Sequence, residues 1–214
     1  MKPGLNSLSN ALIKAKENGL KEIFLEDGEH TIEIYKDEHG RDRNYVVVDF
    51  PITIIGESKD GCIIIGGLRM KGKKEDDVNV KNLTISQSKD YGVYGNGMSF
   101  HLFHLNIEKS GVDGVIVIST KRNTMSNCQV SHSKYCGVFA YDGLITMNGS
   151  GTSVHNNVTS GRSDTYGLET QTFLHTITSS SSIHLVSPLT KESVSINNGG
   201  GGNYGGVVTC IKTI

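Results

Sequence analysis

The sequence lacks a surplus of charge of either sign, and it lacks a long apolar run. Its 21 basic and 22 acidic residues give a formal net charge of −1 and are spread along the chain without a basic block. This balance argues against a protein that coats nucleic acid. Without a run of about 18 apolar residues, no segment is expected to insert into a membrane. Residues 1–19 are too polar for the centre of a secretory signal, and the compartment is left open.

Cysteine is scarce and widely spaced. The four cysteines, at positions 62, 128, 136 and 210, include no Cys-x-x-Cys pair. This spacing argues against a zinc site and against a dithiol redox motif. We therefore expect buried free thiols.

The first regular element is predicted to be a helix. A length of 214 residues with 36% hydrophobic residues fits one domain. Within it, apolar residues recur at helical spacing over 7–18, with Ser7 as the expected N-cap and Gly19 as the expected residue after the C-cap. Residues 1–19 are predicted to form an amphipathic helical segment, separate in character from residues 20–214.

After Gly19 the helical period disappears, and short apolar or β-branched runs alternate with turn residues. The early strands are predicted at 22–25, 31–35, 45–48, 52–55 and 62–65. The last strands are predicted at 183–186, 194–196 and 207–211, and flexible loops are expected at 178–182 and 197–203.

An internal repeat determines the expected architecture. Residues 80–85, 102–107, 125–130 and 153–158 align, and their closing residues Ile85, Ile107, Val130 and Val158 lie 22, 23 and 28 residues apart. A unit of about 22 residues cannot bury its own apolar face, so it must stack on its copies. The fourth copy is expected to place Gly161 where the other three have a serine.

Stacking in parallel predicts columns of equivalent residues, spaced by about 4.8 Å. One apolar column consists of the four closing residues, and a second consists of Val93, Val115, Val138 and Leu168. A polar column contains Asn82, His104, Asn127 and His155. We expect it to form a hydrogen-bonded ladder at a corner of the coil, and a ligand-binding histidine column is the alternative.

Several segments together resemble the pectin lyase-like right-handed β-helix superfamily. They are Lys-Glu-Ile-Phe-Leu-Glu-Asp-Gly-Glu-His-Thr-Ile at 21–32, Ile-Thr-Ile-Ile-Gly-Glu at 52–57, Cys-Ile-Ile-Ile-Gly-Gly at 62–67 and Val-Lys-Asn-Leu-Thr-Ile-Ser at 80–86, followed by Tyr-Gly-Val at 91–93. The resemblance implies an all-β fold, a single-stranded right-handed parallel β-helix over 20–214, with residues 1–19 as its capping helix. It does not imply one function, because the superfamily includes lyases, hydrolases, epimerases, viral spikes and non-catalytic modules.

Charged residues near the repeat turns are the candidates for chemistry. Asp90 and Asp113 precede glycines on successive coils and are the candidate metal ligands. They lack the further acidic residues of a six-oxygen shell, so no cofactor is expected, calcium included.

A lyase or C5-epimerase needs a base and a cation around one sugar. The candidates for these roles are His132, Lys134, Arg162 and Asp164, and ordinary charged turns are the alternative. Hydrolase motifs are missing, since there is no Asp-Asp pair on a repeat strand and no Gly-His-Gly. Tyr166-Gly167-Leu168 is similar to an element of alginate epimerases, but Glu-Thr-Gln-Thr at 169–172 replaces the Asp-Pro-His-Asp of that family.

Aromatic residues near the glycine-containing turns are candidates for carbohydrate stacking. They are Tyr91, Tyr94, Tyr135, Tyr141 and Tyr166. Tyr94 and Phe139 are expected in one column with Ile116 between them. An exposed column would be a binding strip, whereas a buried one would be core.

The leading interpretation is a non-catalytic module whose flat face binds a polysaccharide or a protein partner. The alternatives are a small polysaccharide lyase or C5-epimerase, and a structural subunit of a spike or shell. Homo-oligomerisation is left open.

Overall fold

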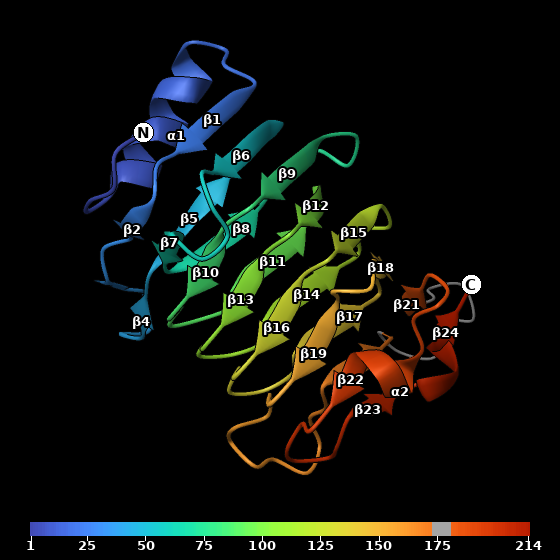
Figure 1. Cartoon of the computed structure of the whole chain (residues 1–214). Coiled ribbons are helices and arrows are strands. Elements are labelled where there is room, and N and C mark those ends of the chain that lie inside the picture. The colour runs from blue at the N-terminus through green and yellow to red at the C-terminus, as the bar shows by residue number, and fades with distance from the viewer. Residues whose placement is uncertain (173–180) are drawn as a thin grey trace.

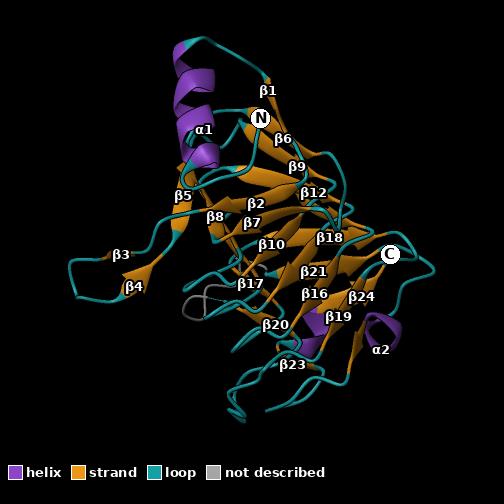
Figure 2. Cartoon of the chain, turned by 60° about the vertical axis from the view of Figure 1, so that its left-hand side comes forward, coloured by secondary structure: helices purple, strands orange, loops and turns teal. Residues whose placement is uncertain are grey.

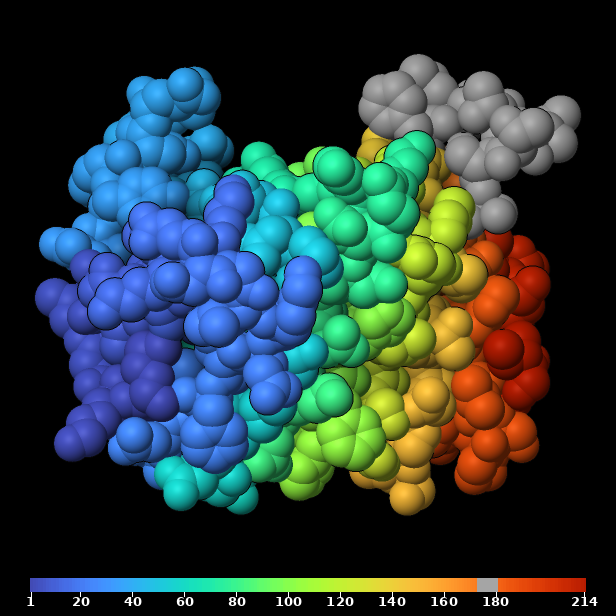
Figure 3. Space-filling model, turned by 90° about the horizontal axis from the view of Figure 1, so that it is seen from above, coloured from blue at the N-terminus to red at the C-terminus, as the bar shows by residue number. Residues whose placement is uncertain are grey.

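The chain forms a right-handed parallel β-helix, as predicted from the repeat and the resemblance. The structure is a computed structural model that describes residues 1–172 and 181–214. Successive coils stack along one axis, and the two termini lie at opposite ends of the stack (Figure 1). The space-filling view shows the same progression of coils from the N-terminal to the C-terminal end (Figure 3).

Each coil contributes short strands to three parallel sheets, and each strand pairs with its equivalent one coil away. Sheet 1 has eight strands in the described residues: β1 (Glu22–Leu25), β6 (Ile52–Gly56), β9 (Asp77–Lys81), β12 (Ser99–Phe103), β15 (Asn123–Ser126), β18 (Leu144–Asn148), β21 (Ser182–Leu185) and β24 (Ile211–Thr213). Sheet 2 contains β2 (Gly28–Thr31), β7 (Cys62–Ile65), β10 (Thr84–Ser86), β13 (Asn106–Glu108), β16 (Gln129–Ser131), β19 (Ser153–His155) and β22 (Ser195–Ile196). Sheet 3 contains β5 (Tyr45–Val48), β8 (Gly67–Met70), β11 (Val93–Asn96), β14 (Val115–Ile118), β17 (Val138–Tyr141), β20 (Leu168–Gln171) and β23 (Tyr204–Gly206).

Helix α1 (Ser7–Glu17) packs against the first coil, where it contacts β1, β2 and β5. Its buried residues Leu8, Ala11, Leu12 and Ala15 join the same apolar core as the solenoid. The helix thereby covers apolar side chains at the N-terminal end of the stack. The expected N-cap is wrong by one residue, since Asn6 is the N-cap and the Ser7 hydroxyl instead lies 2.8 Å from Nδ1 of the buried His30. Gly19 follows the C-cap with a φ of 66°, as predicted.

The core consists of columns of equivalent apolar residues. Ile64, Ile85, Ile107, Val130 and Val154 are aligned in sheet 2, and Leu68, Val93, Val115, Val138 and Leu168 are aligned in sheet 3. All of them are fully buried. Glycine begins β8 and immediately precedes β11, β14, β17 and β20, and it permits close packing, because a side chain on Gly114 would overlap Val130.

The predicted register of the fourth repeat is wrong. Val154, and not Val158, pairs with Val130, so the extra residues lie in the turn after β19 and not before it. Val158 has a φ of 59° in that turn. The place expected for Gly161 is occupied by Asn157, whose side-chain oxygen accepts a hydrogen bond from the backbone of Ser133.

Three of the four residues predicted for the polar column do lie at a corner of the coil. Asn82, His104 and Asn127 have φ values of 56°, 57° and 51°, which asparagine and histidine adopt more readily than most residues. Nδ1 of His104 lies 3.1 Å from Oδ1 of Asn82, and Asn82 donates to the carbonyl of Gly56. His155 is not part of this ladder, because the shifted register places it in β19.

The coil is interrupted between β2 and β5. The predicted strand at 31–35 is wrong, since β2 ends at Thr31 and the chain leaves the sheet to form the antiparallel hairpin of β3 (Tyr35–Lys36) and β4 (Asp42–Arg43). This hairpin projects from the body of the solenoid (Figure 2).

The C-terminal coils are less regular. Helix α2 (Lys191–Val194) precedes β22, and a 3-10 helix (Val208–Cys210) occupies most of the strand predicted at 207–211. In the segment 197–203, the Asn198 side chain donates to the carbonyl of Val154. Of the loop predicted at 178–182, residues 178–180 lie outside the described residues and Ser182 begins β21.

The cysteines agree with the expectation of free thiols. All four cysteines are free, and all except Cys210 are buried. Neither described helix is long and apolar enough to span a membrane.

The core register predicts a large difference between two substitutions near β13. Ile107→Asp places a charge in the fully buried column between Ile85 and Val130, and we expect it to lower the free energy of unfolding by about 3 kcal/mol or more. Lys109→Asp changes an exposed residue with a φ of 55°, which aspartate tolerates, and should cost less than about 1 kcal/mol. Chemical denaturation measures both values. Equal midpoints for the two variants would contradict the register.

Candidate functional site

The outer face of sheet 3 has a row of side chains, one from each of the strands β5 to β20. The register aligns Val47, Arg69, Tyr94, Ile116, Phe139 and Glu169 in β5, β8, β11, β14, β17 and β20. A second outward row aligns Asn96, Ile118, Tyr141 and Gln171. We call these two rows the sheet 3 strip. It is amphipathic, with an arginine near one end, carboxylic and amide groups near the other, and apolar or aromatic side chains between them.

Each aromatic side chain of the strip lies against a second aromatic ring. The Phe139 and Tyr141 rings meet edge to face with centroids 6.0 Å apart, and the Tyr91 ring lies 5.3 Å from the Tyr94 ring. Phe139 and the two tyrosines of the strip are half-buried, while Ile116 between Tyr94 and Phe139 is only 4% exposed. The predicted column of Tyr94, Ile116 and Phe139 is therefore partly buried, and it is neither a fully exposed strip nor part of the core.

Arg69 is held at the N-terminal end of the strip. Its guanidinium carbon lies 4.0 Å from the centroid of the Tyr45 ring and 4.9 Å from that of Tyr94, which places the charge between two aromatic rings. The same group donates to Asp90 at 2.5 Å. Asp90 is only 3% exposed, and its other oxygen pairs with Arg43 at 3.1 Å.

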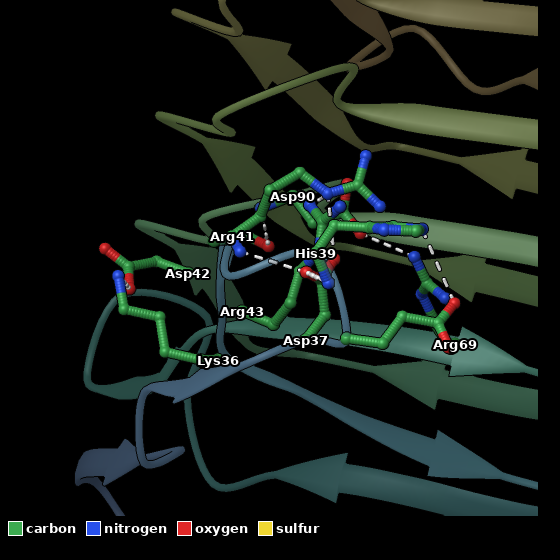
Figure 4. A network of polar contacts seen from close by, with 10 residues as sticks. Lys36, Asp37, His39, Arg41, Asp42, Arg43, Arg69 and Asp90 are labelled. Atoms are coloured by element: carbon green, nitrogen blue, oxygen red, sulfur yellow. Dashed lines mark hydrogen bonds and ion pairs between the residues drawn. The ribbon is translucent and has the colours of Figure 1, made fainter.

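The hairpin supplies Arg43 and is itself fixed by Asp37 (Figure 4). Asp37 accepts hydrogen bonds from the backbone of His39 and Arg41 and from the side chains of Arg41 and Arg43. Although desolvation acts in the opposite direction, these bonds lower the pKa of the Asp37 carboxyl. The chain of contacts from Asp37 through Arg43 and Asp90 to Arg69 joins the hairpin to sheet 3.

A pocket of about 230 Å³ lies at the C-terminal end of the strip. Its lining includes Tyr135 and Phe139, the guanidinium-bearing Arg162, the carboxyl groups of Asp113, Asp164 and Glu169, and the amide of Gln171. This is less than the roughly 300 Å³ at which pockets for drug-sized ligands begin, so the pocket is a small subsite on a longer face.

Two buried carboxyl groups and a thiol form the floor of this pocket. The backbone of Cys136 donates to Asp113 at 2.8 Å, and the Cys136 thiol donates to Glu169 at 2.8 Å. The Gln171 amide donates to the other Glu169 oxygen at 2.5 Å. Asp113 is 6% exposed, Cys136 is 3% exposed and Glu169 is 2% exposed.

Burial raises the pKa values of all three groups. For Asp113, desolvation outweighs the hydrogen bond from Cys136, the charges of Glu169 and Asp90 add to it, and the pKa rises to about 7. Desolvation likewise raises the pKa of Glu169. The Cys136 thiol has its pKa raised by burial and by the charges of Asp113 and Glu169, which makes it a hydrogen-bond donor and a poor nucleophile.

Arg162 and Asp164 form the outer wall of the pocket. Their side chains pair at 2.6 Å, and hydrogen bonding to Asp164 raises the pKa of the Arg162 guanidinium. The guanidinium carbon lies 5.6 Å from the centroid of the Tyr135 ring, and the Lys134 ammonium lies 5.5 Å from the same ring.

The predicted catalytic residues are therefore divided between two places. Arg162 and Asp164 line the pocket, whereas Lys134 is exposed beside it and lies outside the lining. His132 meets the His155 ring, with centroids 6.5 Å apart. Burial, followed by the charge of His132, lowers the pKa of His155.

The other predicted ligands also differ in their placement. Asp90 is bonded to two arginines, while Asp113 is in the pocket floor. Tyr91 is in the turn before β11, where burial and the charges of Asp113 and Asp90 raise its pKa to about 12. Tyr166 packs against the glycine-rich segment, since a side chain on Gly201 or Gly205 would overlap its ring. Across residues 1–172 and 181–214, no three His, Cys, Asp or Glu side chains are grouped to hold a metal ion.

Sequence reasoning did not predict Arg43, Arg69, Cys136, Glu169 or Gln171 as part of the site. Three of them could have been found by extending the repeat alignment to every outward position. Arg69 and Glu169 continue the row of Tyr94 and Phe139, and Gln171 continues the row of Tyr141. Arg43 and Cys136 have no such signal, because one comes from the inserted hairpin and the other acts through its backbone and a thiol.

The family is decided by a match over residues 66–209, which is more than half of the 214-residue chain, to the family described as the right handed beta helix region. The chain belongs to this family. Its repeats, sheets and stacked columns are the features expected of a right-handed β-helix.

Two solved structures from Azotobacter vinelandii are among those to which this chain is similar. The A-module of the mannuronan C-5 epimerase AlgE6 has 10% sequence identity and a TM-score of 0.31, over 96% of this chain and 92% of that one. The A-module of AlgE4 has 10% identity and a TM-score of 0.27, over 99% and 96%. No curated protein matches the sequence.

The raised pKa of Asp113 predicts a pH dependence of stability. The folded β-helix retains this proton up to about pH 7, whereas the unfolded chain loses it near the ordinary value of 3.8. Between these pH values the folded state binds more protons, so the free energy of unfolding falls as pH rises, by at most about 1.4 kcal/mol per pH unit. Asp113→Asn removes this contribution, and denaturant midpoints measured across the range should fall less steeply with pH.

Asp76→Asn, in the loop before β9, is the matched control and should follow the wild-type profile. Parallel profiles for wild type and Asp113→Asn would show that the Asp113 carboxyl is not held protonated by its surroundings.

Proposed function

We propose that this β-helix is a glycan-binding module and that the sheet 3 strip is its binding face. The observation that carries the proposal is the pocket at the end of the strip, where two aromatic rings, Tyr135 and Phe139, stand beside carboxyl, amide and guanidinium groups. Aromatic faces pack against the C–H groups of sugars, and the polar groups are suited to sugar hydroxyls.

The shape of the strip supports a chain-like ligand. Its residues recur once per coil at the strand spacing of about 4.8 Å, so the two rows run along the solenoid axis across several coils. The row of Arg69 begins in β5, next to the hairpin in the chain, and both rows continue to β20 at the pocket. An extended polymer could contact the aromatic side chains and the pocket at the same time.

Catalysis by a lyase or epimerase is the second candidate, and one observation favours it. Asp113 and Glu169 are buried carboxyl groups with raised pKa values beside a pocket, an environment common for groups that transfer protons. The cation needed to neutralise a uronate carboxylate is already engaged, because Arg162 is paired with Asp164. For this reason we favour binding over catalysis.

A structural role has less support from the outer face of sheet 1. Phe24 and Phe103 are 51% and 49% exposed there, but Ile55 and Lys81 separate them along the same row. They do not form a continuous apolar patch of the kind that marks a protein interface.

Phe139→Ala should weaken glycan binding about tenfold, because it removes the aromatic face at the pocket. Affinity electrophoresis against a panel of soluble polysaccharides measures this loss. Phe103→Ala is the matched control, since it removes an aromatic ring from the outer face of sheet 1 and should leave binding unchanged.

Arg162→Ala is a second variant that separates a loss of binding from a folding defect. This side chain is exposed, so the melting temperature should not change while binding still weakens. If no polysaccharide of the panel retards the wild-type protein, this result would contradict the proposal and favour a protein partner. A rise in ultraviolet absorbance with pectate or alginate that disappears in Glu169→Gln would favour the enzyme.

A further inference from the structure

We propose that the sheet 3 strip selects uncharged glycans and excludes polyuronates. This inference rests on the proposed function and adds the class of ligand. It follows from the way in which charges along the strip are paired.

The arginines on the strip and beside it are already bonded to protein carboxylates. Arg69 donates to Asp90, and Arg43 bridges Asp90 and Asp37. Arg162 pairs with Asp164. A ligand carboxylate would therefore have to displace a carboxylate held at 2.5 to 3.1 Å, and Asp90 would then be left buried without its partners.

The pocket has more carboxyl groups than cations. Among the described residues that line it, Asp113, Asp164 and Glu169 oppose one guanidinium, that of Arg162. A uronate in the pocket would lose water from its carboxylate and find no unpaired guanidinium among the lining residues, since Arg162 is already bonded to Asp164. Removing a charge from water without giving it a partner disfavours a charged ligand more strongly than its neutral analogue.

The same groups suit hydroxyl groups well. A protonated carboxyl both donates and accepts a hydrogen bond, and an ionised one accepts two or more. Burial favours the protonated form of Asp113 and Glu169. The pocket thus offers both donors and acceptors to an uncharged sugar, together with the Phe139 and Tyr135 rings.

Lys134 is the group through which a polyuronate could still bind. It is exposed and lies on the Tyr135 ring at the edge of the pocket. A uronate attracted by Lys134 alone would bind weakly and would be released by salt, because an exposed charge pair is screened.

The test uses matched glycans that differ at C6, where one member of each pair has a carboxylate and the other an uncharged group. One pair is an oligosaccharide of β-1,4-mannan and the β-1,4-mannuronan oligosaccharide of equal length. The other is an oligogalacturonate with its carboxylates free and the same molecule with its carboxylates methyl-esterified. By calorimetric titration, at least one neutral member should bind the wild-type protein about tenfold more tightly than its charged counterpart.

Asp164→Asn should reduce the difference in affinity between the neutral and the charged glycan, because it frees the Arg162 guanidinium and removes one negative charge from the pocket wall. Glu75→Gln is the control, since it removes one negative charge from the exposed loop before β9 and should leave the difference unchanged. Tighter binding of the charged member of either pair would overturn the inference and leave the proposed function intact. If the protein binds none of these four oligosaccharides and no polysaccharide retards it, the proposed function would be overturned as well.

Discussion

Parallel pairing between each strand and its equivalent one coil away is the constraint on which the rest of the structure depends. It places equivalent residues of successive coils side by side at about 4.8 Å, so one outward position becomes a row and one inward position becomes a buried column. The Ile85 column holds the coils together from inside. The same pairing aligns Arg69, Tyr94 and Phe139 in a row on the outer face of sheet 3.

The pairing also explains why charged groups can be buried beside the strip. Cys136 is one coil beyond Asp113 and donates its backbone N–H to that carboxyl, while its thiol donates to Glu169 on the next coil. At the other end Asp90 accepts from Arg69, which comes from the preceding coil. Each buried carboxyl therefore has donors from neighbouring coils, which offset the cost of removing it from water.

Much of the fold could be predicted from the sequence because its signal is periodic. The apolar column of Val93, Val115, Val138 and Leu168 was predicted residue by residue, and the structure confirms it. The error at Val158 arose because Val154 and Val158 are both apolar and β-branched. The sequence between them does not reveal on which side of β19 the extra residues lie.

The site was less predictable than the fold because its contacts are not periodic. Glu169 meets Cys136 across 33 positions of sequence, and the interval contains the irregular turn of Arg162 and Asp164. Arg43 reaches Asp90 from a hairpin that no other coil repeats. His132 and Lys134 were plausible partners for Arg162 by spacing, but side-chain direction separates them, since His132 turns toward His155 and Lys134 lies outside the pocket.

Mapping of backbone amide shifts by NMR during titration with the β-1,4-mannan oligosaccharide and the methyl-esterified oligogalacturonate tests the central claim most directly. A ligand on the sheet 3 strip should shift amides in β11, β14, β17 and β20 and in the turn that contains Arg162, while the outer face of sheet 1 around His101 and Phe103 stays unchanged. Shifts that centre on the outer face of sheet 1 or on helix α1 would contradict the account.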